Sequence, residues 1–256
     1  MPEQQTQGTA LSALTWWSKA IFFGAVIAAL LLPIGAIGAR LGIWSFGVGF
    51  LMLAAAAVLA VIGVVTGIAA IIAAHRRNLS RDKQPVYLGT MISLLVLAFV
   101  GMQFYAASTV PPIHDITTDV SDPPQFDQVV ALRGDRSNPL EYDAQRVAPL
   151  QQQAYPWLRP LSTELPPDQA LERAVVVLDD MGLEIVNVDP SAGRVEATAT
   201  TFWFGFKDDV VVRVRAADGG GVDGGSVVDV RSVSRVGVSD VGANARRIDR
   251  FVEKFQ

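Results

Sequence analysis

The stretch "DDVVVRVRAADGGGVDGGSVVDVRSVSR", residues 208–235, decides the fold of the C-terminal half of this chain. On both sides of a central link, valine alternates with arginine, aspartate or serine, which predicts two half-buried β-strands at residues 209–216 and 226–234. The link, residues 217–226, is so rich in glycine that we expect only a flexible hairpin. It precedes a strand rather than a helix, so it lacks the structural context of a phosphate-binding loop.

The sequence around this hairpin predicts the rest of a small α+β domain. Residues 166–182 are expected to form an amphipathic helix that two prolines open and Gly182 closes. Residues 239–255 predict a second amphipathic helix after the last strand. Further strands are expected at residues 158–165, 183–189 and 194–203. The order β-α-β-β-β-β-α predicts a small antiparallel sheet with helices on one face.

Three uncharged apolar runs precede this domain, at about residues 20–39, 43–74 and 86–107. Each is long enough to cross a hydrocarbon core of about 30 Å. We therefore predict a membrane-anchored α+β protein whose first partner is the lipid bilayer. Its parts are a tail at residues 1–19, a transmembrane region at 20–110, a Pro/Asp/Gln-rich linker at 111–156 and the α+β domain at 157–256. Because prolines disfavour helix, the linker is expected to form an extended stalk.

The basic residues between the spans predict the orientation of the chain. The loop at residues 75–85, "HRRNLSRDKQP", carries four Lys or Arg, whereas the first loop carries only Arg40. By the positive-inside rule the second loop is cytoplasmic, and with three spans the N-terminus is cytoplasmic too. We therefore expect a multi-pass protein of a bacterial plasma (inner) membrane whose C-terminal domain is periplasmic or extracellular.

Composition excludes several classes of function. Residues 1–110 hold six Lys or Arg and two Asp or Glu, a charge of +4, so the total of −4 leaves −8 on residues 111–256. An acidic soluble half argues against a nucleic-acid partner, because phosphate binding needs a positive field. The chain has no cysteine, and its only histidines are His75 and His114. Composition thus excludes thiolate chemistry, and we expect no metal, no cofactor and no His-based catalytic triad.

Polar residues of the hairpin and of the last helix form the candidate site. Adjacent side chains on a strand point to opposite faces, so Asp229, Arg231 and Arg235 share one face, on which arginines of the preceding strand can pair with Asp229. For the same reason Asp208 and Asp209 cannot both reach one substrate unless a bulge or turn intervenes. The candidate cluster consists of Asp208, Asp209, Arg231, Ser232, Ser234, Arg235, Ser239, Asp240, Asn244 and Arg247.

Two local features complete this candidate site. Ser239 or Asp240 can cap the final helix, whose free N–H groups and positive dipole end would then lie near Arg235. Phe202 and Phe204 are candidates for an aromatic wall beside the cluster, because they share the phase of the polar side chains. Trp203 alternates with them and is expected in the core.

Two quoted stretches carry a resemblance to a known family. "FWFGFKDDVVVRV" (202–214) and "DVRSVSRVGVSDVGANARRI" (229–248) resemble the paired signatures of the domain-of-unknown-function family numbered 1499. The resemblance covers roughly residues 136–255. Many members carry Pro-Asn-Cys-Val-Ser near the domain start, where this chain has only "RSNP" (136–139) and no thiol. The resemblance implies a fold and an architecture, and no established activity.

The sequence leaves two functions open for the exported domain. The first is a non-enzymatic envelope module that binds an envelope protein or an anionic small ligand, and the absence of cysteine and the scarcity of histidine favour it. The second is a hydrolase or transferase on an anionic envelope substrate, which would use Asp208 and Asp209 with Arg231 and Arg235. A structural reading, in which the two aspartates cap a turn and pair with arginines, competes with both.

Overall fold

The structure is a computed structural model that describes residues 14–217 and 225–256. Most of the tail predicted at 1–19 and the centre of the glycine-rich link therefore lie outside the described residues. The chain divides into two compact units, Met1–Gln103 and Phe104–Gln256.

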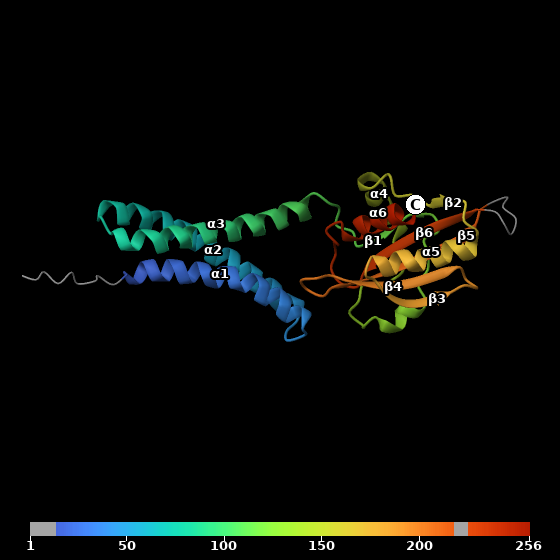
Figure 1. The fold of residues 1–256 in the computed structure, drawn as a ribbon, viewed down its shortest axis with the longest axis horizontal. Helices are drawn as coiled ribbons and strands as arrows, with labels where there is room; N and C mark the ends of the chain where they lie inside the picture. Colours follow the sequence, from blue (N-terminus) through green and yellow to red (C-terminus); the bar gives the residue numbers. More distant parts are fainter. Residues whose placement is uncertain (1–13, 218–224) are drawn as a thin grey trace, which may run out of the picture. The chain divides into compact units, whose positions relative to one another are not determined.

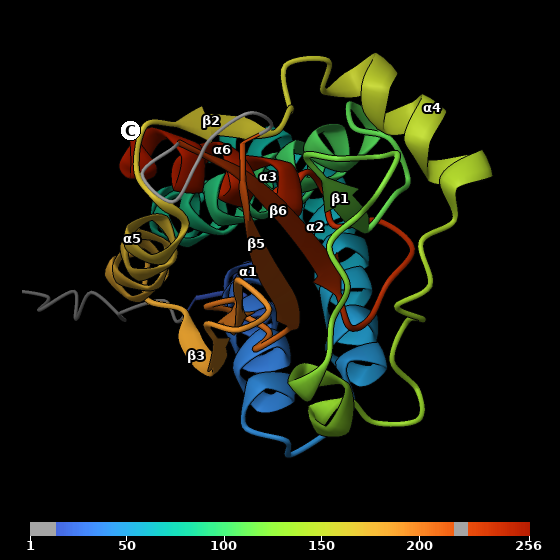
Figure 2. The same cartoon turned by 90° about the vertical axis from the view of Figure 1, so that its right-hand side faces the viewer.

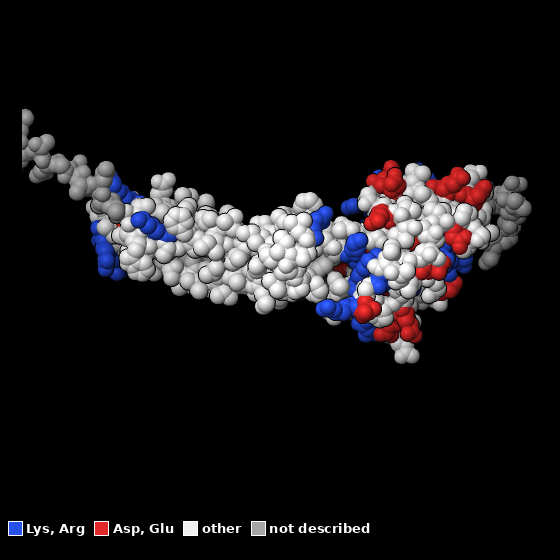
Figure 3. Space-filling model, turned by 90° about the horizontal axis from the view of Figure 1, so that it is seen from below, with Lys and Arg blue, Asp and Glu red and all other residues white. Residues whose placement is uncertain are grey.

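The N-terminal unit consists of long apolar helices (Figure 1): α1 (Trp16–Arg40), α2 (Phe46–Arg76) and the greater part of α3 (Ser80–Ser108). All three helices are long and apolar enough to cross a membrane, which confirms the three predicted spans. On the face drawn in Figure 3, most of the Lys and Arg of the helical unit gather at one of its ends, and uncharged side chains cover most of its length.

Small residues allow these helices to pack closely. A Cβ atom at Gly63 would overlap the Ser93 hydroxyl, and one at Gly67 would overlap the Thr90 hydroxyl. These glycines of α2 therefore serve contacts with α3 inside the chain, as in other membrane helix pairs. At the start of α3 the buried Asp82 carboxylate accepts hydrogen bonds from the backbone N–H of Thr15, at 2.9 Å, and from the Ser18 hydroxyl, at 2.6 Å, so it joins the start of α3 to the start of α1.

The C-terminal unit is built on one antiparallel sheet, with β1 (Asp115–Thr117), β2 (Leu161–Thr163), β3 (Glu184–Asp189), β4 (Arg194–Thr200), β5 (Lys207–Ala216) and β6 (Ser226–Ser234). The strand order is β1-β6-β5-β4-β3, and β2 also pairs with β6. Figure 2 shows β6 between β5 and β1. The predicted hairpin is the β5–β6 pair at the centre of the sheet. From β2 to α6 the elements follow the predicted order β-α-β-β-β-β-α.

Two helices pack on one face of this sheet, α5 (Pro167–Asp180) and α6 (Ala243–Phe255). Val195, Val212 and Val230 are cross-strand neighbours on that face, and none is more than 1 % exposed. Leu178 and Ile248 of the two helices belong to the same core. β-Branched side chains fit a pleated surface covered by helices, which explains the valine-rich pattern of the hairpin.

The structure corrects the interpretation of residues 111–156 as an extended stalk. The segment contributes β1, the short 3₁₀-helix η1 (Gln128–Leu132) and α4 (Ala144–Ala154) to the C-terminal unit. Ile113 and Ile116 are fully buried in its core. Residues 118–143, hereafter the covering segment, lie over the sheet face opposite α5 and α6, where η1 contacts β3 and β4.

The covering segment is ordered because it bonds to charged side chains of the sheet and not to apolar ones. Its backbone N–H groups at Asp127 and Gln128 donate to the two carboxylate oxygens of Glu196, at 2.5 and 2.7 Å. Proline and aspartate are compatible with such a segment, because its backbone N–H groups donate to side chains of the sheet and do not need a helix or a strand.

Candidate functional site

The sheet face under the covering segment carries an array of charged side chains, most of them buried. We call this surface the charged face. Strand alternation brings together cross-strand neighbours, since Thr198 lies opposite Asp209 and Arg213 lies opposite Asp229. Its charged members are Asp115, Arg194, Glu196, Asp209, Arg213, Arg215, Asp229, Arg231 and Arg235.

Arg231 is the largest of these groups that has no solvent exposure. Its guanidinium donates to both carboxylate oxygens of Asp115, at 3.0 and 2.8 Å, and to the carbonyl oxygens of Pro124 and Leu140. The rings of Phe126 and Tyr142 lie 5.3 and 5.5 Å from it. Burial raises the pKa of Tyr142. Arg231 thus ties β6 to residues far away in the sequence.

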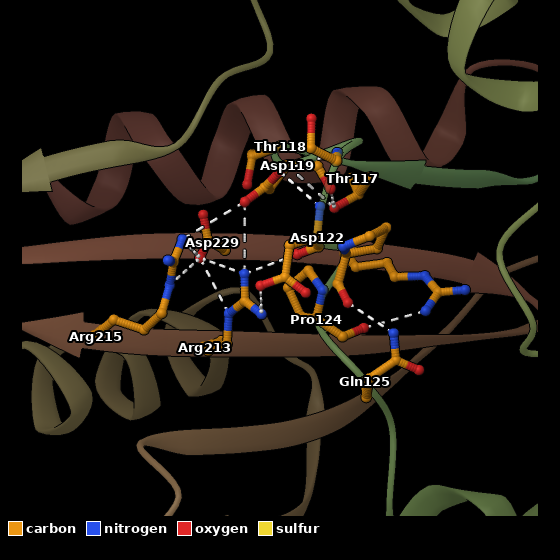
Figure 4. Close-up of polar contacts among 12 residues, drawn as sticks. Thr117, Thr118, Asp119, Asp122, Pro124, Gln125, Arg213, Arg215 and Asp229 are labelled. Atoms are coloured by element: carbon orange, nitrogen blue, oxygen red, sulfur yellow. Dashed lines mark hydrogen bonds and ion pairs between the residues drawn. The ribbon is translucent and has the colours of Figure 1, made fainter. Parts of the chain in front are cut away.

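Asp229 forms a second group on the charged face (Figure 4). One of its carboxylate oxygens accepts from Arg213 at 2.9 Å and from Arg215 at 2.7 Å. Above them, the covering segment supplies Asp122, 2.8 Å from Arg213, and Asp119, within 3.6 Å of both arginines. The predicted pairing of strand arginines with Asp229 is confirmed, but the two additional aspartates come from the segment predicted as a stalk.

Asp209 and Asp208 lie on opposite sides of the sheet. Asp209, which is fully buried, accepts from Arg235 at 2.8 Å, from the Thr198 hydroxyl at 3.0 Å, and from Arg133 of the covering segment. Asp208 instead faces α6 and accepts from Arg247 at 2.6 Å. The expectation that adjacent strand carboxylates cannot share one substrate therefore holds in the structure.

A polar junction joins β6 to the start of α6. Asn244 accepts from the Ser232 hydroxyl at 2.7 Å and donates to the Ser234 hydroxyl at 3.0 Å, and all three residues are buried. Arg247 donates to Ser232 and Asn244 as well as to Asp208. The candidate cluster is thus divided between this junction and the charged face.

The N-terminus of α6 already holds a carboxylate. Asp240 accepts from the backbone N–H groups of Gly242, at 2.7 Å, and Asn244, at 2.8 Å. Burial raises the pKa of Asp240, and these two hydrogen bonds partly counteract that rise. Ser239 accepts from the backbone N–H of Val241 at 3.2 Å. The predicted cap is present as Asp240, so the predicted anion site at this helix start is filled by the protein itself.

The aromatic stretch forms a loop at the end of β4. That strand ends at Thr200, and the backbone N–H of Thr201 donates to the carbonyl of Phe206 at 2.8 Å, which closes the turn. Phe204 stacks on Phe206 with ring centroids 5.2 Å apart. Phe202 is 75 % exposed, and Trp203, expected in the core, is 54 % exposed. Trp203 leaves the core because the chain turns before the strand alternation reaches it.

One small cavity in this unit is lined by arginines that the sequence analysis did not combine. The cavity, hereafter the arginine pocket, measures about 230 Å³. Its walls come from the α5–β3 junction, the end of β4 and the first turns of α6. The lining residues are Met181, Gly182, Leu183, Ala199, Thr200, Ala243, Arg246, Arg247 and Arg250.

The charges in the arginine pocket are only partly compensated. Arg247 pairs with Asp208, and Arg246 donates to the carbonyl oxygen of Val241 at 3.1 Å. Within residues 14–217 and 225–256, neither Arg246 nor Arg250 has a carboxylate partner. The two lie four residues apart on one helix face, where like charges destabilise each other. The i, i+4 spacing of the two arginines is the feature of the sequence that could have indicated this pocket.

Besides the arginine pocket, a site in this unit could be an apolar cavity or a group of residues that binds a metal. A larger cavity of about 600 Å³ lies between α5 and β3, lined by apolar residues with Asp168 and Glu172 at its edge. In the described part of the chain no group of three or more His, Asp or Glu residues is placed to hold a metal ion.

Comparison with known proteins adds a family without a function. Residues 115–255 match the family described as "Protein of unknown function (DUF1499)". No curated protein matches the chain. The match begins at the first residue of β1, so it includes most of the segment that the sequence analysis assigned to a linker.

Proposed function

This chain belongs to the DUF1499 family of proteins of unknown function, and from that premise we propose that it is a membrane-anchored binding module for an anionic ligand. The helices α1 to α3 anchor it, and the C-terminal unit carries the binding site. We further propose that this unit lies outside the cytoplasm, on the periplasmic or outer side of a bacterial plasma membrane.

The arginine pocket is the observation that carries this proposal. Arg246 and Arg250 have no carboxylate partner among the described residues, whereas Arg231 and Arg235 are bonded to Asp115 and Asp209. A guanidinium group binds phosphate or carboxylate in a bidentate manner, and an anion between two arginines would relieve their repulsion. We therefore assign anion binding to Arg246 and Arg250 in place of Arg231 and Arg235.

The size and the walls of the pocket support a small anionic group. About 230 Å³ accommodates a phosphate or carboxylate group with a few further atoms. Among the residues that the structure describes, no Asp or Glu lines the cavity, so no carboxylate in its described wall repels an anion. The backbone N–H groups at the start of α6 contribute little, because Asp240 already accepts from two of them.

The enzyme alternative receives no comparable support. A two-carboxylate hydrolase needs both groups at one bond. Asp208 and Asp209 point to opposite faces of β5, and each is held by arginine. Anion binding in the arginine pocket does not require either aspartate to be exposed.

A thermal-shift measurement on the full-length protein in detergent tests the proposal. Pyrophosphate and inorganic phosphate should raise the unfolding midpoint above that in chloride at equal ionic strength, because a ligand that binds only the folded state stabilises it. Matching the ionic strength removes the general screening of arginine repulsion.

Matched variants identify the site. Arg250→Gln and Arg246→Gln should each reduce the phosphate-dependent rise, and the double variant should abolish it. Arg159→Gln, an exposed arginine near β2, should keep the full rise. Equal losses in all three single variants, or no rise in the unsubstituted protein, would contradict anion binding in this pocket.

A further inference from the structure

Apolar side chains are exposed together at one end of the sheet in the C-terminal unit. At this end β4 and β6 finish, β5 begins, and residues 110–114 join the sheet, so we call it the tether end. The loop between β4 and β5 exposes Phe202 by 75 % and Trp203 by 54 %, and the loop between β6 and α6 exposes Val238 by 77 %. The two loops are adjacent, since the backbone N–H of Arg235 donates to the carbonyl of Lys207 at 2.9 Å.

Val241 adds a strained apolar residue to the same surface. Its φ is +52°, in the left-handed region that a β-branched residue rarely adopts, and its side chain is 36 % exposed. Such strain tends to occur at functional sites. Glycine or asparagine would fit this backbone better, so a valine here indicates that an apolar side chain at this position has a use.

The chain ties this surface to the end of a membrane-length helix. The carbonyl of Ile113 accepts from the backbone N–H of Asp240 at 3.1 Å, and Val110 lies against Gly242. α3 ends at Ser108, two residues before Val110. Two residues of extended chain span about 7 Å, which is comparable to the thickness of the headgroup layer on one side of a bilayer, about 5–8 Å.

The last turns of α3 mark that layer. Phe104 and Tyr105 are 78 % and 70 % exposed there. Aromatic residues concentrate where membrane helices leave the hydrocarbon core. Three helical residues from Tyr105 to Ser108 add about 5 Å to the two extended residues, so the tether end starts within about 12 Å of the hydrocarbon boundary.

We propose that Phe202, Trp203, Val238 and Val241 insert into the headgroup region of the bilayer that α3 crosses. The occupant of this surface is thus the lipid itself, and the two loops hold the C-terminal unit against the membrane. Exposed aromatic and aliphatic side chains in loops gain free energy by entering this interface. The inference does not depend on the arginine pocket or on its ligand.

Site-directed spin labelling of the full-length protein tests this contact, because the chain contains no cysteine of its own. Phe202→Cys and Val238→Cys each place a nitroxide at the tether end. Val188→Cys is the matched control, since Val188 is an exposed valine, 40 % accessible, near the opposite end of β3. Each protein is reconstituted into liposomes made only of phosphatidylcholine and phosphatidylglycerol, so no partner protein is present.

The readout is the collision rate of the nitroxide with oxygen, which partitions into lipid, relative to a water-soluble nickel chelate. In these liposomes the nitroxides at 202 and 238 should collide with oxygen much more often, relative to the nickel chelate, than the nitroxide at 188, which stays accessible to nickel. If both tether-end labels match the label at 188, the surface does not enter lipid and the proposal fails. Two labelled loops keep the test decisive if one variant does not fold.

Discussion

Arg231 shows what the buried charges of the C-terminal unit require. Moving a guanidinium out of water costs several kcal/mol, and only complete pairing offsets that cost. Arg231 has a bidentate carboxylate, two carbonyl oxygens and two aromatic rings around it. The same requirement applies to Asp209, which two arginines and one hydroxyl surround. At this scale, charge pairing across the sheet is a structural device.

Replacing Asp209 by asparagine tests this view directly. Asp209→Asn leaves Arg133 and Arg235 buried without their shared carboxylate, so the free energy of unfolding should fall by about 3–5 kcal/mol. Asp179→Asn, at an exposed position of α5, should change it by less than about 0.5 kcal/mol. Both values can be measured by urea unfolding of the full-length protein in detergent, followed by near-ultraviolet circular dichroism.

A catalytic role of Asp209 predicts the opposite pattern. An acid–base group at an active site can be replaced by its amide with little loss of stability. If Asp209→Asn unfolds at the same urea concentration as the unsubstituted protein, the carboxylate is not the structural centre that its contacts indicate, and the enzyme alternative regains its support.

The alternation of side chains along a strand explains which charge pairs could be predicted from the sequence. Arg213 and Asp229 are cross-strand neighbours within one hairpin, so the two-residue period was enough to bring them together. Arg231 and Asp115 are 116 residues apart, and Arg133 and Asp209 are 76 apart. No periodicity connects such distant residues, because their pairing depends on where the covering segment crosses the sheet.

Among the elements, the covering segment is the one whose role differs most from its composition. Proline and aspartate indicate a chain without regular structure, and most of it has none. Its order comes from ion pairs and from hydrogen bonds to carboxylates on the sheet. Secondary-structure propensities of single residues do not include these interactions. The helices α5 and α6 and the strands β3 to β6, by contrast, follow from apolar periodicity and were predicted from it.

Hydrogen exchange distinguishes a covering segment from a stalk. The backbone N–H groups of Asp127 and Gln128 donate to Glu196, and hydrogen bonds to a charged group contribute about 1.5–3 kcal/mol. A peptide spanning residues 125–132 should therefore exchange at least about tenfold more slowly than an unstructured chain, since 1.4 kcal/mol corresponds to a factor of ten. Mass spectrometry of the full-length protein in detergent measures this directly.

Glu196→Ala should bring the exchange of that peptide close to the unstructured rate. Glu172→Ala, on the exposed side of α5, should leave it slow. Fast exchange of residues 125–132 in the unsubstituted protein would restore the stalk interpretation, and it would remove the cover from the charged face.

At the scale of the whole molecule, the two units differ in charge as well as in fold. Residues 1–110 carry +4 and residues 111–256 carry −8. The helices of the first unit are long and apolar enough to cross a membrane, but their lengths do not determine which end of each helix faces the cytoplasm. That choice depends on the four Lys or Arg of residues 75–85, where α2 ends and α3 begins, because basic segments stay on the cytoplasmic side.

Cysteine accessibility in intact cells tests this proposed orientation. Ser80→Cys places a thiol next to the basic loop and Ser162→Cys places one in β2, and both replace an exposed serine in a chain with no other cysteine. A membrane-impermeant maleimide should label residue 162 once the outer barrier of the cell is permeabilised, and it should label residue 80 only after the cells are lysed. Labelling of residue 80 in unlysed cells, with residue 162 protected, would reverse the orientation. The anionic ligand of the arginine pocket would then have to be a cytoplasmic molecule.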